Sequence, residues 1–417
     1  MKFSDFGRRF SEPTGITTLM DDLGRAMAGQ DDMLMLGGGN PAHIPAVQAV
    51  WRRRMEEILA DGDAYERMLA NYDTPKGNPQ FIEELAAFLN RHFGWGIGTE
   101  NIAVMNGGQT ALFCLINVLA GRTLDGHRKI LFPLMPEYIG YADQCIEPDT
   151  FVAVKPRMEF LGNHTFKYRI DFDALEVTPD VGAICVSRPT NPTGNVLTDD
   201  EVLALSRLAQ ENGIPLIVDN AYGNPFPGVI FTDAQPLWAP GMILTLSLSK
   251  LGLPGTRTGV VVGPPEIAHA LSSINSILSL ASGNLGQTLV WPLLKNDEVL
   301  HVTRELIRPF YERKSQQAVE WVHEFFPDDL DYHVHKSEGA FFLWVWLKGL
   351  PISTVELYER LKARRMLCVP GSYFYFGLRE PWRQQDECLR LSFAQGEEDV
   401  REGLRILGEE VRRAYNG

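Results

Sequence analysis

Between about residue 100 and residue 265, the sequence alternates short runs rich in β-branched residues with helical patterns. The strand-like runs read NIAVM, KILFPL, FVAV, GAICVS, IPLIVDN, MILTLSLS and TGVVVG. Helical patterns begin at Thr110 and at Thr198, and Thr198 and Glu201 have the spacing of a capping box. This alternation predicts an α/β fold whose large domain has a mostly parallel sheet with helices on both faces.

The pattern changes in the last third of the chain. A helical pattern over 297–325 is followed by the strand-like GAFFLWVWL, a helix near 354–365, the strand-like CLRLSFA and a final amphipathic helix. This order is typical of a smaller α+β domain, and 417 residues exceed the usual size of a single core. We expect residues 1–50 to form an N-terminal arm and part of the small domain, 51–295 the large domain and 296–417 the small C-terminal domain.

The charge and the cysteine content limit which binding partners and which cellular compartment we expect for this protein. The formal net charge of −14 argues against nucleic acid and against anionic membrane surfaces. The five cysteines form no CxxC pair, and their odd number cannot complete a disulfide framework. The longest apolar run, ALFCLINVLAG, is too short to span a bilayer, and the N-terminus lacks the apolar core of a signal peptide. We therefore expect a cytoplasmic protein without a membrane partner.

Lys250 stands where the apolar pattern of TLSLSKLGLPGTRTG stops. Burial at a strand end lowers the pKa of a lysine, and a neutral amine can attack a carbonyl group. An isolated lysine there would more often be a solvated strand cap. However, Ser247 and Ser249 offer hydroxyl groups, and Arg257 can present a planar guanidinium to a phosphate. Together these residues suggest a phosphorylated aldehyde held as a Schiff base.

Two further segments could bind such an aldehyde. MNGGQTALF follows a strand and opens a helix, so the backbone amides of Gly107, Gly108 and Gln109 would face a phosphate, although a Gly-Gly turn alone is a weak signal. LIVDNAYGNPF ends a strand with Asp219 and continues to Tyr222. A carboxylate there could pair with a protonated pyridine nitrogen and a phenol could bind the 3′ oxygen, but Asp219 could equally form a turn.

Other candidate residues carry weaker signals. Asn191 in SRPTNPTGNV could reach the same 3′ oxygen or a substrate carboxylate, or could simply form an Asn-Pro turn. Tyr138 in LMPEYIGY could stack on a planar ring, although a buried tyrosine is the default. His333 and His335 share one strand face without a third ligand, so we expect no metal site.

Three motifs carry a family resemblance: NPTG at 191–194, VDNAYG at 218–223 and SLSKLGLPGTRTG at 247–259. In this order and at these separations they resemble the class I/II aminotransferases, which have the aspartate-aminotransferase-like fold, fold type I of the pyridoxal-phosphate enzymes. The resemblance implies pyridoxal 5′-phosphate as cofactor, bound covalently by Lys250. It implies cofactor contacts from Gly107, Gly108, Gln109, Tyr138, Asn191, Asp219, Tyr222, Ser247, Ser249 and Arg257.

The resemblance also implies partners and substrates. Tyr72 matches a tyrosine that reaches the neighbouring subunit's cofactor phosphate, which implies a homodimer with shared active sites. Arg390, with Gly39 and Asn191, matches the residues that bind the substrate α-carboxylate. The GGQ loop lacks a serine common in the family, so we expect its backbone amides to hold more of the phosphate.

The expected activity is transfer of an amino group from an amino acid to a 2-oxo acid. No second arginine stands in a recognisable motif for a side-chain carboxylate, and the expected pocket residues Ile16, Tyr373 and Phe374 are apolar or aromatic. We therefore expect small aliphatic donors such as valine and alanine, with pyruvate as an acceptor. A pyridoxal-phosphate lyase or decarboxylase would share the cofactor residues. A non-catalytic ligand sensor would need a basic DNA-binding segment, and residues 1–50 offer none.

Overall fold

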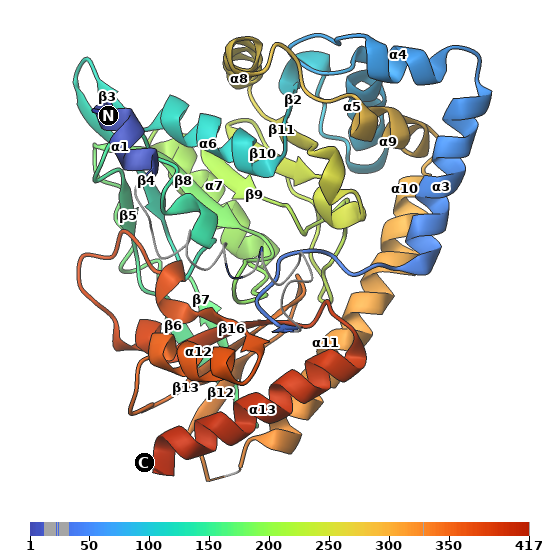
Figure 1. Cartoon of the computed structure of the whole chain (residues 1–417). Coiled ribbons are helices and arrows are strands. Elements are labelled where there is room, and N and C mark those ends of the chain that lie inside the picture. The colour runs from blue at the N-terminus through green and yellow to red at the C-terminus, as the bar shows by residue number, and fades with distance from the viewer. Residues whose placement is uncertain (12–21, 23, 25–32, 328, 417) are drawn as a thin grey trace.

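The larger sheet forms the centre of the upper half of the molecule in Figure 1. The computed structural model describes residues 1–11, 22, 24, 33–327 and 329–416.

This larger sheet has the order β2-β11-β10-β9-β8-β4-β3, with β5 beside β4. Strands β10, β9, β8, β4 and β5 pair in parallel, whereas β11 is antiparallel to both of its neighbours and β3 is antiparallel to β4. The predicted mostly parallel sheet is therefore confirmed. Its strands are β2 (Ile102–Met105), β3 (Gly121–Thr123), β4 (Gly126–Phe132), β5 (Phe151–Ala153), β8 (Val181–Ser187), β9 (Leu216–Asp219), β10 (Met242–Ser247) and β11 (Gly259–Val262).

Helices cover both faces of this sheet, as the alternating pattern predicts. A capping box closes the first turn of helix α7: Thr198 Oγ1 accepts from the backbone N of Glu201 at 3.2 Å, and Glu201 Oε2 accepts from the backbone N of Thr198 at 2.8 Å. The central strands β9, β10 and β11 are buried on both faces, which explains their continuous apolar sequences. The helices of this half are α3 (Pro45–Ala60), α4 (Ala64–Ala70), α5 (Pro79–Phe93), α6 (Gly108–Leu119), α7 (Asp199–Glu211), α8 (Pro265–Leu278) and α9 (Leu285–Lys295).

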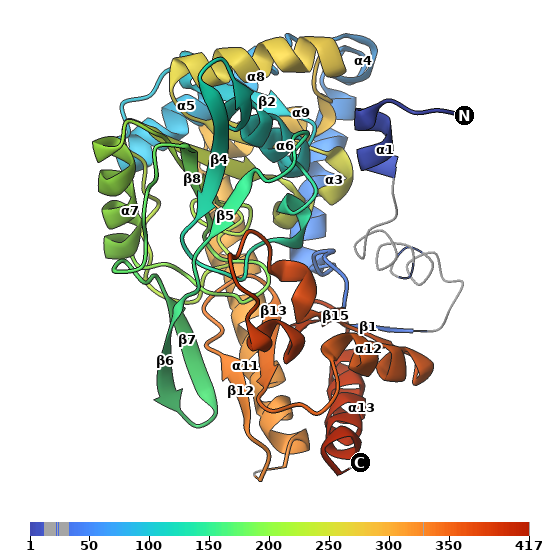
Figure 2. The same cartoon turned by 90° about the vertical axis from the view of Figure 1, so that its left-hand side faces the viewer.

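A second sheet of order β15-β16-β13-β12-β7-β6 forms the lower half. Four of its strands come from the last third of the chain: β12 (Tyr332–His335), β13 (Phe342–Leu347), β15 (Val369–Pro370) and β16 (Cys388–Ser392). The other two, β6 (Arg157–Gly162) and β7 (Thr165–Arg169), form a hairpin that descends from the upper half (Figure 2). The division at 51–295 and 296–417 stays a prediction, but the hairpin within 51–295 completes the sheet of the smaller half.

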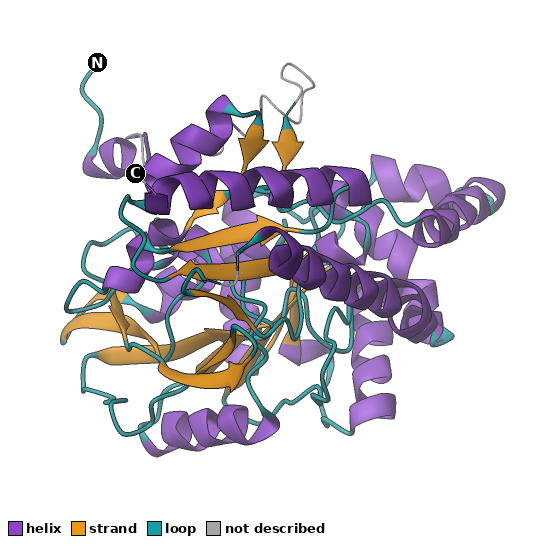
Figure 3. Ribbon diagram, turned by 90° about the horizontal axis from the view of Figure 1, so that it is seen from below, coloured by secondary structure: helices purple, strands orange, loops and turns teal. Residues whose placement is uncertain are grey.

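Long helices line the outside of the second sheet. α11 (Arg308–Phe325) and α13 (Glu397–Asn416) pack side by side, and Figure 3 shows helices outside the strands when the molecule is viewed from below. The predicted helix over 297–325 is interrupted, because α10 (Glu298–His301) passes through a π-helical turn at Val302–Ile307 before α11 begins. α12 (Thr354–Ala363) completes this layer, and α1 (Asp5–Ser11) lies near the N-terminus.

The segment 34–40 connects the two halves. β1 (Leu34–Met35) pairs in parallel with β14 (Met366–Leu367), and the carbonyl oxygen of Leu36 accepts from the backbone N of Ser392 in β16 at 2.6 Å. The following glycines turn toward the ends of the large sheet, where they line a cavity. This part of the N-terminal region therefore lies at the junction of the two halves. Among the described residues, no helix combines the length and the apolar character needed to cross a membrane.

Candidate active site

Strand register brings three polar residues into one row. Asp219, the last residue of β9, lies beside Ser187 of β8 on one side and beside Thr245 of β10 on the other. All three stand at or near the carboxyl ends of parallel strands, the edge at which α/β sheets bind ligands. Ser187, Asp219 and Thr245 are distant in sequence, and strand pairing brings them together as the floor of a candidate site.

A cavity of about 320 Å³ opens above this row, between the two halves. Most of the residues singled out from the sequence line it, although they come from segments up to 351 residues apart. From the predicted set, the lining includes Gly39, Gly108, Gln109, Tyr138, Asn191, Asp219, Tyr222, Ser247, Ser249, Lys250, Arg257 and Arg390. The structure thus collects in one cavity the cationic, anionic and aromatic groups that the motifs predict.

One end of the cavity is built to bind an anion. Helix α6 begins at Gly108 without a side-chain cap, so the backbone amides of its first turn face the cavity. The Arg257 guanidinium lies against Gly107, where a Cβ atom would come within 2.4 Å of Nη2. Gly259 permits the approach of β11 to this turn, because a Cβ on Gly259 would lie 2.4 Å from the carbonyl carbon of Gly107. Gly107 itself shapes this end but is not among the lining residues.

Lys250 projects into the middle of the cavity. Its Nζ donates to the carbonyl oxygen of Gly39 at 2.6 Å and lies 5.3 Å from the ring centroids of Tyr222 and Phe341. Burial and the nearby guanidinium groups of Arg390 and Arg257 lower the pKa of this amine from 10.5 to about 7, although Asp219 acts in the opposite direction. The amine is consequently neutral in a large share of molecules near neutral pH, as a nucleophile or proton carrier requires.

Asp219 is surrounded by hydrogen-bond donors. Its Oδ2 accepts from the hydroxyl of Tyr141 at 2.6 Å, and its Oδ1 accepts from Thr245 Oγ1 at 2.9 Å and from the backbone N of Ala221 at 3.1 Å. Burial raises the pKa of this carboxyl, and the three donors oppose the rise because they favour the ionised form. A buried carboxylate fixed in this way can hold a cation that enters the cavity.

Arg390 spans the two halves. Its Nη1 donates to Asn191 Oδ1 at 2.9 Å and its Nη2 to the carbonyl oxygen of Gly37 at 2.7 Å. Its guanidinium carbon lies 4.3 Å from the ring centroid of Phe342 and 5.2 Å from that of Phe374, which restrict the plane of the group. Its Nε is buried without a hydrogen-bond partner. An oriented guanidinium with a free donor in a cavity is suited to bind a carboxylate.

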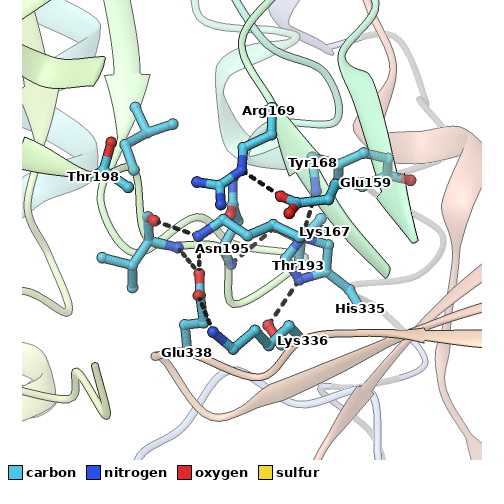
Figure 4. Close-up of polar contacts among 12 residues, drawn as sticks. Glu159, Lys167, Tyr168, Arg169, Thr193, Asn195, Thr198, His335, Lys336 and Glu338 are labelled. Atoms are coloured by element: carbon cyan, nitrogen blue, oxygen red, sulfur yellow. Dashed lines mark hydrogen bonds and ion pairs between the residues drawn. The ribbon is translucent and has the colours of Figure 1, made fainter. Parts of the chain in front are cut away.

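The loop that carries Asn191 is supported from the side opposite the cavity. Figure 4 shows Lys167 of β7 directed toward Glu338, with which it forms a buried ion pair. Lys167 Nζ also donates to the carbonyl oxygen of Val196 at 3.0 Å, and the backbone N of Val196 donates to Glu338 Oε2 at 3.2 Å. The backbone N of Glu338 donates in turn to the carbonyl oxygen of Gly194 at 3.3 Å. The pair therefore ties the end of the NPTG loop to the second sheet.

Some predicted residues lie outside the cavity. Tyr72 does not line it and is 82% exposed. Phe374 packs under Arg390 and, like Tyr373, is not among the lining residues, so both differ from the pocket role expected from the sequence. Ile16 lies outside the described residues.

The two histidines of the YHVHK segment have other partners. The backbone N of Tyr168 donates to His335 Nε2 at 3.1 Å, and His333 Nε2 contacts Asp331 Oδ1 at 3.0 Å. In the part of the chain that the structure describes, no group of three or more His, Cys, Asp or Glu residues could hold a metal ion.

Sequence reasoning missed Ser187, which lines the cavity beside Asp219, and Glu137 and Tyr141, which are not among the lining residues. Ser187 Oγ is 2.6 Å from Glu137 Oε2 and 3.0 Å from the hydroxyl of Tyr141. The available signal was a glutamate within the otherwise apolar segment LFPLMPEYIGY, but a single glutamate near a proline usually reads as a surface turn.

The family follows from the comparison with known proteins. Residues 31–407 match the family model of aminotransferases of class I and II. The chain belongs to this family. The valine–pyruvate aminotransferase of Escherichia coli (strain K12) is 46% identical to this aminotransferase over 416 residues, which cover 100% of this chain and 99% of that protein.

Solved structures agree with this assignment. A crystal structure of valine–pyruvate aminotransferase from Salmonella typhimurium LT2 superimposes on this aminotransferase with a TM-score of 0.89 and 44% identity, covering 96% of this chain and 100% of that chain. An aspartate aminotransferase of Thermus thermophilus shares the fold at a TM-score of 0.76 and 22% identity, with 98% and 100% covered. The expected aspartate-aminotransferase-like fold and family are confirmed. Because these relatives are aminotransferases, they favour transamination over the lyase or decarboxylase alternative.

Proposed function

We propose that this aminotransferase uses pyridoxal 5′-phosphate to move the amino group of valine, or of a similar small aliphatic amino acid, to a 2-oxo acid such as pyruvate. The full-length similarity to a valine–pyruvate aminotransferase supports the substrates. The observation that carries the proposal is the single cavity in which Lys250, Asp219 and Arg390 converge. An amine, a carboxylate and a guanidinium there match an aldehyde, a ring nitrogen and a substrate carboxylate.

The residues present fit the cofactor, on which enzymes of this family depend. The α6 N-terminus, Ser247, Ser249 and Arg257 would hold its phosphate, and Asp219 would face its ring nitrogen. Tyr138 would lie against the ring, while Asn191 and Tyr222 would reach the 3′ oxygen. When bound, pyridoxal phosphate supplies an electron sink for the charge that develops at the substrate α-carbon.

Lys250 would bind the aldehyde and carry the proton. The pKa of about 7 leaves its amine able to accept a proton near neutral pH and to return it. The short contact to the Gly39 carbonyl oxygen fixes the position of Nζ in the cavity. Lys250 therefore needs no separate general base in order to move a proton at the substrate α-carbon.

Arg390 would bind the α-carboxylate of the substrate, with Asn191 and the backbone at Gly39 beside it. Among the described residues that line the cavity, the cationic side chains are Lys250, Arg257 and Arg390. Lys250 and Arg257 are assigned to the cofactor, so a side-chain carboxylate of the donor would remain unpaired and would be costly to bury. This supports aliphatic donors over dicarboxylic ones.

A homodimer would complete the site. Tyr72 follows α4, and the loop after it contacts α8, because Asn275 Nδ2 donates to the carbonyl oxygen of Pro75 at 2.8 Å. Exposed apolar side chains of α4, its following loop, the C-terminal end of α8 and the turn after it include Leu69, Tyr72, Ile277, Leu278 and Leu280. Such a surface favours contact with a second copy of the chain. We propose that Tyr72 reaches the cofactor phosphate of the partner.

Borohydride trapping tests the cofactor assignment. After incubation with pyridoxal phosphate and borohydride, label should appear on the peptide that contains Lys250, and Lys250→Ala should show neither this label nor turnover. Label on a different lysine would overturn the assignment. The substrate assignment is tested by the ratio of kcat/KM for L-valine to that for L-aspartate with pyruvate as acceptor, which should exceed one.

Subunit mixing tests the shared site. Lys250→Ala and Tyr72→Phe subunits should form mixed dimers with one undamaged site, so the mixture should recover activity above that of Tyr72→Phe alone. A mixture that never exceeds Tyr72→Phe would exclude action of Tyr72 on the partner's site. Molecular mass by light scattering, measured on the same samples, reports whether dimers form at all.

A further inference from the structure

A continuous chain of four side chains runs from the cavity floor into the core. Tyr141 donates to Asp219 at 2.6 Å, Ser187 Oγ lies 3.0 Å from the Tyr141 hydroxyl, and Glu137 Oε2 lies 2.6 Å from Ser187 Oγ. Glu137, the last of the four side chains, is 1% exposed and is not among the residues that line the cavity. In the part of the chain that the structure describes, no ion pair involves Glu137.

The three contacts require three protons. Each hydroxyl supplies one, so Tyr141 and Ser187 together account for two. The third proton must belong to one of the two carboxyl groups, Glu137 or Asp219. If both were ionised, one of the three short oxygen–oxygen contacts would have no hydrogen between its atoms, inside a buried environment where an unsatisfied polar contact is costly.

The surroundings of the two carboxyl groups decide where the third proton resides. Each accepts two other hydrogen bonds: Glu137 from the backbone N of Ser187 at 2.8 Å and of Tyr138 at 3.2 Å, and Asp219 from Thr245 and Ala221. Asp219, however, lines the cavity and is attracted to the Lys250 amine when that group is charged. Among the described residues, no cationic side chain forms an ion pair with Glu137, so the negative charge belongs on Asp219.

We infer that Glu137 is a positioning residue, a neutral carboxylic acid whose proton orders the hydrogen bonds that hold Asp219 as an anion. Glu137 donates to Ser187, Ser187 donates to Tyr141, and Tyr141 donates to Asp219, so every donor in the chain points toward the cavity. Where it concerns the cofactor, the inference rests on the proposed function: the ordered chain would keep Asp219 ionised and aimed at the ring nitrogen.

Burial supports this proton assignment. It raises the pKa of Glu137 to about 8, with a smaller contribution in the same direction from the charge of Asp219. At pH 7 roughly ten molecules would therefore carry neutral Glu137 for each one that carries the anion. Above about pH 8 the proton leaves, and one hydrogen bond of the chain is lost.

Infrared spectroscopy of the full chain without cofactor tests the protonation directly. At pH 7 wild type should show the carbonyl band of a protonated buried carboxyl group, and the band should fade as the pH rises through about 8. Glu137→Gln should lack the band, while Asp143→Asn, an exposed carboxyl on the same segment, should keep it. The inference would be overturned if wild type showed no such band or if the band persisted in Glu137→Gln. It would also be overturned if Asp219→Asn removed the band while Glu137→Gln kept it.

Cofactor binding tests the effect on Asp219. The dissociation constant of pyridoxal phosphate is measured for Lys250→Ala and for Lys250→Ala with Glu137→Gln, because removing Lys250 removes its titration. Between pH 7 and pH 9 the dissociation constant of Lys250→Ala should rise about threefold to tenfold more than that of the double variant, since only Lys250→Ala loses one hydrogen bond of the series. An equal pH dependence in both proteins would refute the link to Asp219. If neither protein binds pyridoxal phosphate, the proposed function fails, whereas the infrared result still decides the protonation of Glu137.

Discussion

Lys250 should destabilise the protein that contains it when no cofactor is bound. Its amine is forced into a desolvated cavity beside Arg390 and Arg257, which lowers its pKa from 10.5 to about 7. At about 1.4 kcal/mol for each pH unit, this change corresponds to about 5 kcal/mol. Because Lys250 keeps some solvent contact through the cavity, we expect about 2–3 kcal/mol in practice. Lys250→Met, which keeps the length of the side chain, should therefore raise the free energy of unfolding.

The sign of the pH dependence follows from the lowered pKa. Below about pH 7 the lysine is protonated in both the folded and the unfolded protein, so the full cost of charging it in the cavity is present. Between about pH 7 and 10.5 only the unfolded state binds the proton, and the cost decreases as the pH rises. The gain from Lys250→Met should be largest at pH 6 and should have nearly vanished at pH 10.

Urea unfolding of the cofactor-free protein measures this difference. Wild type and Lys250→Met are compared at pH 6, 8 and 10 at one protein concentration, since assembly of subunits would change apparent stability. Lys295→Met, whose side chain is 64% exposed, serves as the control and should show no such pH-dependent gain. A gain for Lys250→Met that is equal at pH 6 and pH 10 would refute desolvation of the amine as its cause.

Three further substitutions test the geometry of the site. Arg390→Lys should lower kcat/KM for the donor amino acid by about 30- to 150-fold, because an ammonium group cannot reproduce the guanidinium fork and about 2–3 kcal/mol would be lost. An unchanged kcat/KM would contradict this role of Arg390. Glu338→Ala should lower the free energy of unfolding by about 3–5 kcal/mol in urea titrations, since Lys167 would remain buried and unpaired. Gly259→Ala should lower stability by about 1–3 kcal/mol and weaken pyridoxal phosphate binding, because its Cβ would collide with the Gly107 backbone.

The part of the fold that the sequence predicts is the part with strong local patterns. Buried parallel strands and capped helices leave a signal in short windows, as at Thr198–Glu201 and MILTLSLS. The β6–β7 hairpin is not identified in this way, because polar and apolar residues are mixed in its two strands and its place is set by pairing with β12, far away in the sequence. Whether these residues form strands depends on pairing with a distant segment, which a short sequence window does not contain.

The same limit applies to the site. Lys250 and Asp219 stand out because charged groups stand at the ends of apolar strands, whereas Arg390 is identified by the family resemblance and motif order adds the loop of Asn191. Glu137 could not be identified in this way, since its importance comes from complete burial and from a contact with Ser187 that is 50 residues away. The role proposed for Tyr72 comes from the family resemblance, because a residue that is 82% exposed on the single chain shows no local pattern for such a role.

The route of the β6–β7 hairpin also limits how this chain can be divided. A gene fragment that encodes only residues 296–417 would lack the hairpin, and β12 would then expose a row of unpaired backbone groups at a sheet edge. A fragment that ends near residue 295 would instead carry the hairpin without the strand it pairs with. Splitting the protein at its apparent boundary would therefore yield two aggregation-prone pieces, and complementation would require both fragments to be produced together.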